Sequence, residues 1–128
     1  MKWIFALLLP VAACAGDETL TAYAPTGVTF SLSEIDDAPF NALTTITLEP
    51  GGTFNGRAPC NSFSGNITVP YPWFATGRIA ATRRACDGLR EEQDFFATLS
   101  EMTLSEWSGD LLILSNDAGR QMVFTAQE

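Results

Sequence analysis

The chain of 128 residues contains no histidine, a single lysine and only three cysteines. Without histidine it lacks the usual general base near neutral pH and the commonest protein ligand of zinc. Ser62 and Ser64 lie outside any G-x-S-x-G elbow, so a serine nucleophile of the usual kind is missing as well. We therefore predict that the protein is not an enzyme, and that it has no catalytic residue, cofactor or metal ion.

Positive charge is also scarce, because Lys2 is the only lysine and the net charge is −8. Removal of a leader that carries Lys2 leaves six arginines against fifteen acidic residues, a net charge of −9. A surface of this sign repels the phosphates of nucleic acids, so we exclude nucleic acid as a partner. The apolar fraction of 46% is ordinary for a globular protein and suffices for the core of one domain.

The chain has no apolar run of the roughly 20 residues that a bilayer-spanning helix needs. Its N-terminal run, from Trp3 to Ala13, is interrupted by Pro10 and follows the positive charge of Lys2. This arrangement is typical of an export signal, which we assign to residues 1–13.

The sequence VAAC at 11–14 has the form of a lipobox, the small-residue pattern before the lipidated cysteine of bacterial lipoproteins. We expect cleavage before Cys14 and its acylation, because two or three acyl chains hold a protein stably on a membrane. Ala15 in the next position favours the periplasmic face of the outer membrane. Two alternatives remain open: an ordinary cleavage site that yields a soluble periplasmic protein, and an uncleaved anchor.

We expect three segments: the signal peptide at 1–13, a lipidated N-terminus and tether at 14–26, and one domain at 27–128. The tether is small and polar, with a reach of about 20 Å for a dozen residues, although Leu20 and Tyr23 have the character to pack on the domain. Within the domain, apolar and polar residues alternate as in strands with one buried face. Such extended segments are expected at 28–32, 43–49, 53–57, 66–69, 78–82, 104–107, 111–114 and 121–125.

One segment, beginning near Asp87 or Gly88, has the periodicity of a helix. Glu91, Glu92 and Asp94 are expected to point outward near its N-terminus, where acidic residues complement the helix dipole. The apolar side of the helix is expected to contain Leu89, Phe95, Phe96, Leu99 and Met102. The patterns together predict a β-rich α+β fold, in which one strongly curved or closed antiparallel sheet has a helix covering an opening.

Two cysteines, Cys60 and Cys86, remain once Cys14 is assigned to lipid. Cysteines of an exported protein usually pair, so we predict a disulfide between them. The alternatives are two buried free thiols or a metal-binding pair. Neither a Cys-x-x-Cys motif nor a histidine is present to complete a tetrahedral zinc site.

The residues around these cysteines resemble a known family. The segment FNGRAPCNSFSG at 54–65 resembles the G-x-x-G-C-N-x-F-x-G signature of META domains, the HslJ-like family. ATRRAC at 81–86 is similar to the T-R-M-A-C motif of that family, and FSL at 30–32 to its opening W-x-L strand. The helix of the family is matched by Glu92, Phe96 and Leu99.

The resemblance extends over about residues 27–125 and implies an open, or cracked, β-barrel with one α-helix packed on it. It also implies an association with stress tolerance, or with secretion and motility, and no assigned reaction. Phe30, Pro59 and Arg84 replace the Trp, Gly and Met that are usual in the family. These differences change packing or backbone more than chemistry.

An aromatic loop containing Tyr71, Trp73 and Phe74 provides our candidate binding residues. Rigid aromatic side chains give a large contact area for few rotatable bonds. The alternative is that they close the open end of the barrel.

Polar residues of the two motifs receive structural interpretations. We interpret Asn61 as a turn residue that satisfies backbone groups, with a binding-site amide as the alternative. Arg83 and Arg84 are interpreted as solvated or paired with acidic residues. The alternative is that they bind an anionic ligand. Asp36 and Asp37 are explained by a turn.

The sequence therefore predicts a non-enzymatic lipoprotein of the cell envelope, attached to the membrane by its lipid and binding an envelope protein or an apolar ligand. A role in envelope stress tolerance is implied by the resemblance. The alternative is a periplasmic inhibitor, or a secretion-chaperone lipoprotein of the pilotin kind.

Overall fold

The computed structural model describes residues 16–127, so the predicted signal peptide and Cys14 lie outside the described residues. A short 3-10 helix, η1, precedes the sheet, and a single α-helix interrupts the series of strands. The elements are η1 (Leu20–Ala22), β1 (Thr29–Ile35), β2 (Ala38–Pro39), β3 (Thr45–Glu49), β4 (Thr53–Arg57), β5 (Ser62–Asn66), β6 (Ala80–Ala81), α1 (Leu89–Glu101), β7 (Leu104–Ser108), β8 (Leu111–Ser115) and β9 (Gln121–Ala126). No helix within residues 16–127 is long and apolar enough to cross a membrane.

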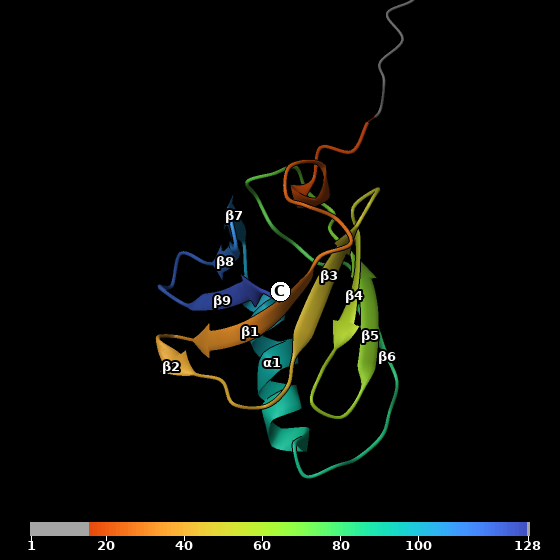
Figure 1. The fold of residues 1–128 in the computed structure, drawn as a ribbon, viewed down its shortest axis with the longest axis vertical. Coiled ribbons are helices and arrows are strands. Elements are labelled where there is room, and N and C mark those ends of the chain that lie inside the picture. The colour runs from red at the N-terminus through yellow and green to blue at the C-terminus, as the bar shows by residue number, and fades with distance from the viewer. Residues whose placement is uncertain (1–15, 128) are drawn as a thin grey trace, which may run out of the picture.

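All strand pairs are antiparallel, and the sheet has the order β6-β5-β4-β3-β1-β9-β8-β7, with β2 added to β1. The register of the β1–β9 pair shifts between Leu32 and Glu34, and such a bulge bends a strand. Figure 1 shows the resulting curvature, with β7 to β9 on one side, β3 to β6 on the other, and α1 behind β1. The end strands β6 and β7 do not pair with each other in the described chain. This confirms an open β-barrel with one packed helix.

The core lies between the concave side of this sheet and α1. Strand residues at alternate positions are buried, including Phe30, Ile46 and Leu48, as the period-two pattern predicts. From the helix, Phe95 and Leu99 are fully buried. Tertiary packing of this apolar face, more than the intrinsic preference of its residues, stabilises a helix of this length.

One predicted strand is displaced. The expected segment at 66–69 is in fact β5 at Ser62–Asn66, and Ile67 makes only an isolated bridge to Thr76. Serine and glycine give β5 the composition of a loop. The glycine is required at position 65 because the ring of Phe54 occupies the space that a side chain would need. A Cβ atom at Gly65 would lie 2.7 Å from Cζ of Phe54. Contact with a ring of the neighbouring strand, rather than strand propensity, determines the residue.

The prediction of a tether at 14–26 is wrong from Asp17 onward. Leu20 is fully buried, and Thr21 Oγ1 accepts a hydrogen bond of 2.8 Å from the backbone N–H of Gly52. The Asp17 carboxylate accepts hydrogen bonds from Thr19 and Thr21. Burial raises the pKa of the Asp17 carboxyl, but these hydrogen bonds outweigh it and hold the pKa below its usual value. The segment is therefore part of the domain.

The turn predicted at Asp36 and Asp37 is present, with both residues at positive φ (51° and 66°). The Asp36 carboxylate accepts hydrogen bonds from the backbone N–H of Gln121 and from the guanidinium of Arg120, which also pairs with Glu101. The Gln121 N–H and then the Arg120 guanidinium hold the pKa of the Asp36 carboxyl below its usual value. This carboxylate therefore has a structural role in joining the turn to β9.

Candidate functional site

The family signature is found where the β4–β5 loop meets the segment that leads into α1. Cys60 and Cys86 form a disulfide with their Cα atoms 5.6 Å apart, as the sequence predicts. The bond joins positions 26 residues apart and fixes the start of α1 to the sheet.

Asn61, next to this disulfide, links three segments of the chain. Its Oδ1 accepts hydrogen bonds from Thr82 Oγ1 (2.9 Å) and from the backbone N–H of Arg84 (2.6 Å). Its Nδ2 donates to the Arg84 carbonyl (3.0 Å) and to Glu92 Oε2 (2.6 Å). An amide has two acceptor positions and two donor hydrogens, so these four bonds use its full capacity. The structural interpretation of Asn61 agrees with this geometry, and no group is left for a ligand.

Glu92 lies on the opposite side of the helix from the one that the sequence analysis predicts. It was expected to point outward, but it is only 4% exposed. Its Oε1 accepts a hydrogen bond of 3.0 Å from the backbone N–H of Cys60, and its Oε2 accepts the one from Asn61. The spacing contained the signal, because Glu92 is three residues before Phe95 and seven before Leu99, on the buried side of the helix.

A polar hollow of about 280 Å³ opens beside this network. It is lined by Arg57, Ala58, Pro59, Cys60, Asn61, Ser62, Thr82 and Arg84. Among residues 16–127, no group of His, Cys, Asp and Glu has the arrangement to hold a metal ion. The Glu92 carboxylate is engaged with Cys60 and Asn61, so the hollow offers positive charge and hydroxyl groups but no poised base.

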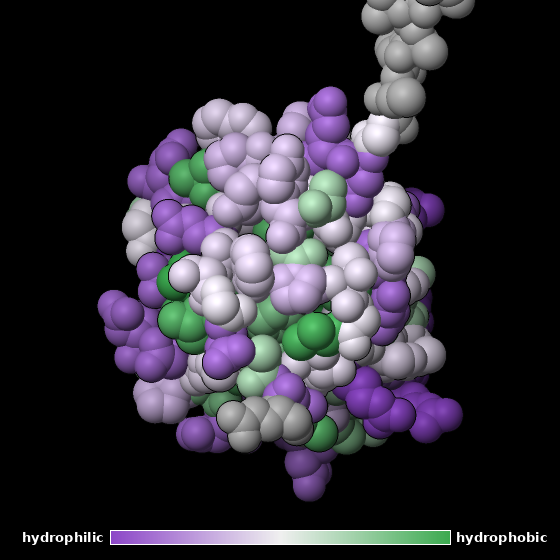
Figure 2. Space-filling view, turned by 45° about the horizontal axis from the view of Figure 1, so that its top comes forward, coloured by the Kyte–Doolittle hydropathy of each residue, from purple (hydrophilic) through white to green (hydrophobic). Residues whose placement is uncertain are grey.

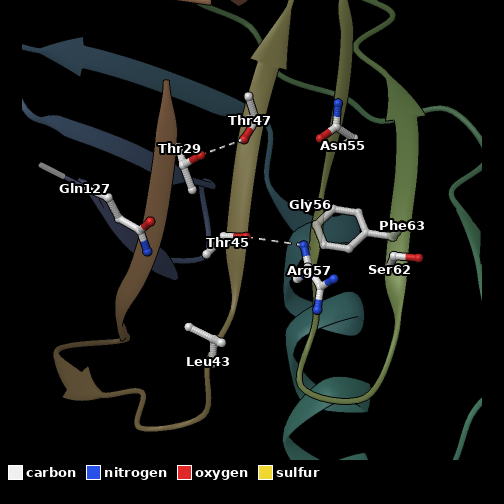
Figure 3. Close-up of a pocket in the computed structure, with 10 residues that line it drawn as sticks. All are labelled: Thr29, Leu43, Thr45, Thr47, Asn55, Gly56, Arg57, Ser62, Phe63 and Gln127. Carbon is white, nitrogen blue, oxygen red and sulfur yellow. Dashed lines mark hydrogen bonds between the residues drawn. The ribbon is translucent and has the colours of Figure 1, made fainter. Parts of the chain in front are cut away.

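A second hollow, of about 530 Å³, lies over β1, β3, β4 and β5 (Figure 3). Thr29 and Thr47 are hydrogen-bonded to each other across it at 3.3 Å, and Thr45 Oγ1 accepts from the backbone N–H of Arg57. The Phe63 ring lies across Gly56, where a Cβ atom would be 2.6 Å from its Cζ. This is a hydroxyl-rich surface on which Arg57 is the ionisable group.

A third hollow, of about 380 Å³, lies between β6 and α1, at the open side of the sheet. Its lining consists of Thr76, Gly77, Ile79, Ala81, Phe96 and Ser100. Ala80 pairs with Ser64 of β5, and the Thr82 N–H donates to the Ser62 carbonyl. By the alternation of an antiparallel ladder, the backbone groups of Ile79 and Ala81 point the other way. In the described chain no strand pairs with that side of β6. We call this hollow, together with the free side of β6, the edge cleft.

The candidate aromatic residues separate into two environments. Phe74 is 2% exposed and belongs to the core, so it is removed from the candidate contact surface. Trp73 is 57% exposed, although its backbone forms a bridge with Leu104 of β7. Tyr71 is half-buried and stacks on Tyr23, with ring centroids 4.9 Å apart. The loop therefore both fills the end of the barrel and presents aromatic side chains to solvent.

An antiparallel sheet that is left open on one side, with a helix in the opening and a stapled β4–β5 loop, defines the class of this domain. The model of the META domain family matches residues 20–128, and the chain belongs to this family. The match begins within η1, in agreement with the packing of the residues that were expected to form a tether.

Solved structures share the fold at low sequence identity. A protein from Burkholderia xenovorans, solved by NMR, has a TM-score of 0.64 and 21% identity, with 90% of this chain and 93% of that chain covered. Another NMR structure has a TM-score of 0.59 at 20% identity, covering 77% and 87%. A DUF4847 family protein from Bacteroides vulgatus has a TM-score of 0.56 at 16% identity, covering 66% and 61%. None of the curated proteins compared with the chain matches it.

Proposed function

We propose that this META domain protein is a non-enzymatic lipoprotein of the bacterial envelope that binds an extended segment of a partner protein at the edge cleft. The observation that carries the proposal is the free side of β6 beside a hollow lined in part by Ile79, Ala81 and Phe96. The lipid on Cys14 places the domain at the periplasmic face of the outer membrane. Its role in envelope stress tolerance is to capture such a segment, and a secretion chaperone would use the same contact.

The backbone of β6 supports this proposal. An unpaired strand edge is a template for another strand, and proteins normally cover such edges. At the other end of the sheet, the loop around Trp73 covers part of β7, where the Ser105 N–H donates to the Pro72 carbonyl at 2.7 Å. At β6, Ile79 and Ala81 retain edge groups that an added strand can use, and the hollow beside Phe96 accepts a side chain of that strand.

Charge indicates the chemistry of the partner segment. Residues 50–86 contain four arginines and no acidic residue, in a chain of net charge −8. Arg78, Arg83 and Arg84 flank β6 and are exposed. Ion pairs in the described part of the chain involve Arg120 alone among the arginines. Complementarity therefore favours an acidic segment with apolar residues at alternate positions.

The binding prediction is tested with a synthetic peptide of alternating glutamate and valine, and with its lysine counterpart. In NMR titrations of the processed protein, the acidic peptide should shift the amide signals of Ile79 and Ala81 and slow their hydrogen exchange. Ala81→Pro removes an edge donor without removing a bond to β5, and should weaken binding about tenfold.

The matched control compares the same charge reversal at two arginines, one beside β6 and one on α1. Arg83→Glu should weaken binding of the acidic peptide several-fold, whereas Arg90→Glu makes the same charge change on the exposed side of α1 and should leave it within about twofold. Equal binding of the acidic and basic peptides, or signal shifts confined to other strands, would contradict the proposal.

Lipidation is tested separately by replacing Cys14 with serine. The wild-type protein should fractionate with membranes and have the mass of a chain that begins at an acylated Cys14. Cys14→Ser should release the protein from membranes or leave the precursor uncleaved. Membrane fractionation and precursor mass that are unchanged by the substitution would exclude the anchor.

A further inference from the structure

Two tyrosines, Tyr23 and Tyr71, stack on each other beside the start of the described chain, and Trp73 follows Tyr71 by two residues on the same loop. Tyr23 is 58% exposed and stacks on Tyr71, and Trp73 is 57% exposed. The Tyr71 N–H donates to the carbonyl of Glu18 at 2.8 Å, so the stacked pair adjoins the residues that follow Cys14. We call these three side chains the aromatic cluster.

The length of chain between the anchor and the domain is short. Asp17 is fixed in the domain, since its carboxylate accepts a hydrogen bond of 2.9 Å from the Thr19 N–H. Three residues of fully extended chain span at most about 11 Å, so the Cα atoms of Cys14 and Asp17 cannot be farther apart. A lipid on Cys14 therefore holds this end of the domain against the bilayer surface, without the free reach of a longer tether.

We propose that the aromatic cluster inserts into the headgroup region of the same membrane that holds the acyl chains of Cys14. This inference rests on the lipidation stated under Proposed function. Tyrosine and tryptophan prefer the membrane–water interface, because their rings are apolar and their O–H and N–H groups remain hydrated. Interfacial side chains enter about 5–10 Å into the boundary between headgroups and acyl chains, a depth within reach of an exposed ring.

The backbone that carries the cluster is already ordered. Pro72 accepts two hydrogen bonds from Ser105, from its N–H at 2.7 Å and its Oγ at 3.1 Å. The Phe74 N–H donates to the Thr103 carbonyl, and the Phe74 ring is in the core. The rings therefore meet the membrane without the entropic cost of ordering a loop. Figure 2 brings this end of the molecule forward and shows white, pale purple and green residues across the middle of the view, with deep purple mainly towards the rim.

Electrostatic attraction is not expected to supply the contact, because Asp17 and Glu18, the charged residues that adjoin the cluster through the Tyr71–Glu18 hydrogen bond, are acidic. The contact should therefore persist at high salt and on vesicles of neutral lipid. It also orients the domain. The segment after β6 runs to the opposite end of the molecule, where α1 begins (Figure 1), so the arginines on that segment face away from the bilayer.

The test uses the native lipidated protein, extracted from membranes and reconstituted into phosphatidylcholine vesicles with and without brominated acyl chains. Removal of the signal peptide takes away Trp3, so Trp107→Phe leaves Trp73 as the single tryptophan, which is excited selectively at wavelengths that tyrosine does not absorb. Its emission should shift to shorter wavelength in vesicles, lose intensity with brominated lipid, and become protected from aqueous iodide. The quenching should be unchanged by high salt. Native protein compared with Trp73→Ser provides a second measurement that does not need the Trp107 substitution.

The control reporter is a tryptophan at position 43, in a chain that also carries Trp73→Phe and Trp107→Phe. Leu43 is exposed and precedes β3, whereas the N-terminal segment reaches the other end of β3, where the Gly27 N–H donates to the Leu48 carbonyl. Leu43→Trp should remain open to iodide and insensitive to brominated lipid. If the protein is acylated and bound to vesicles but Trp73 stays open to iodide, the membrane assignment is overturned and the cluster is left as a protein contact. A mass without acyl chains would overturn the anchor and this inference together.

Discussion

Replacement of Glu92 by alanine should lower the free energy of unfolding by about 4 kcal/mol, because two buried donors lose their acceptor at once. The Cys60 N–H and the Asn61 Nδ2 both donate to this carboxylate, which is 4% exposed. Each donor left unsatisfied costs about 1–3 kcal/mol. Urea denaturation monitored by circular dichroism gives the change directly, with the slope showing whether unfolding remains two-state.

Glu91→Ala is the matched control, since Glu91 is also acidic and in the first turn of α1 but is exposed. Both substitutions remove the same charge near the helix dipole, so their difference isolates the buried network. Glu91→Ala should cost less than about 0.5 kcal/mol. Glu92→Gln should fall between, because its amide retains one acceptor but brings a donor towards Asn61 Nδ2. Equal effects of the Glu91 and Glu92 alanine variants would show that the network contributes nothing to stability.

Removal of the disulfide should lower the free energy of unfolding by nearly as much as Glu92→Ala. In the chain-entropy treatment, a loop of the length closed by Cys60 and Cys86, 26 residues apart, stabilises the folded state by about 3.5 kcal/mol. The variant with both Cys60→Ser and Cys86→Ser should show this loss in chemical denaturation, and reduction of the wild-type protein should reproduce it. A midpoint unaffected by reductant would show that the bond does not constrain the unfolded chain.

The two effects should be coupled. The backbone N–H of Cys60 donates to Glu92, and Cys86 is three residues before α1, so the bond and the hydrogen bonds hold the same junction. Neighbouring groups of this kind usually show interaction energies of about 0.5–3 kcal/mol. Combining Glu92→Ala with the double serine variant should therefore cost less than the sum of the separate losses, because the first change already loosens the junction.

These contacts give the family signature a structural meaning in this chain. Cys60, Asn61, Thr82, Cys86 and Glu92 join the β4–β5 loop, the segment before α1, and α1 itself. The side chains of Asn61 and Glu92 are occupied by other members of the signature, and the proposals therefore use the edge cleft and the aromatic cluster. The edge cleft adjoins the signature, because Ala81 and Phe96 line it, whereas the aromatic cluster lies outside the residues by which the family is recognised.

The N-terminal segment shows where composition misleads. Small polar residues before Gly27 look like a linker, but Thr19 and Thr21 are engaged in hydrogen bonds and Leu20 fills the core. The partner of Thr21 is Gly52, thirty-one residues away in the sequence. A local window contains no information about such a partner, so the sequence predicts a domain that begins at 27, whereas the packed residues begin at 17.

By itself the sequence determined the features that depend on local order. The alternation in β1 and β3, the helical period from Leu89, and the two cysteines left after Cys14 were sufficient to predict a curved antiparallel sheet, one helix and the disulfide. Only the tertiary structure decided which members of an adjacent pair turn inward. Trp73 and Phe74 are neighbours with opposite exposures. For Glu92 the helical period indicates the buried side, but only the tertiary structure supplies the donors that allow a charged group to stay there. The physical reason is that burial of a loop residue or a charged group depends on acceptors, donors and space supplied by segments distant in sequence, whereas periodicity reports only the face of a single element.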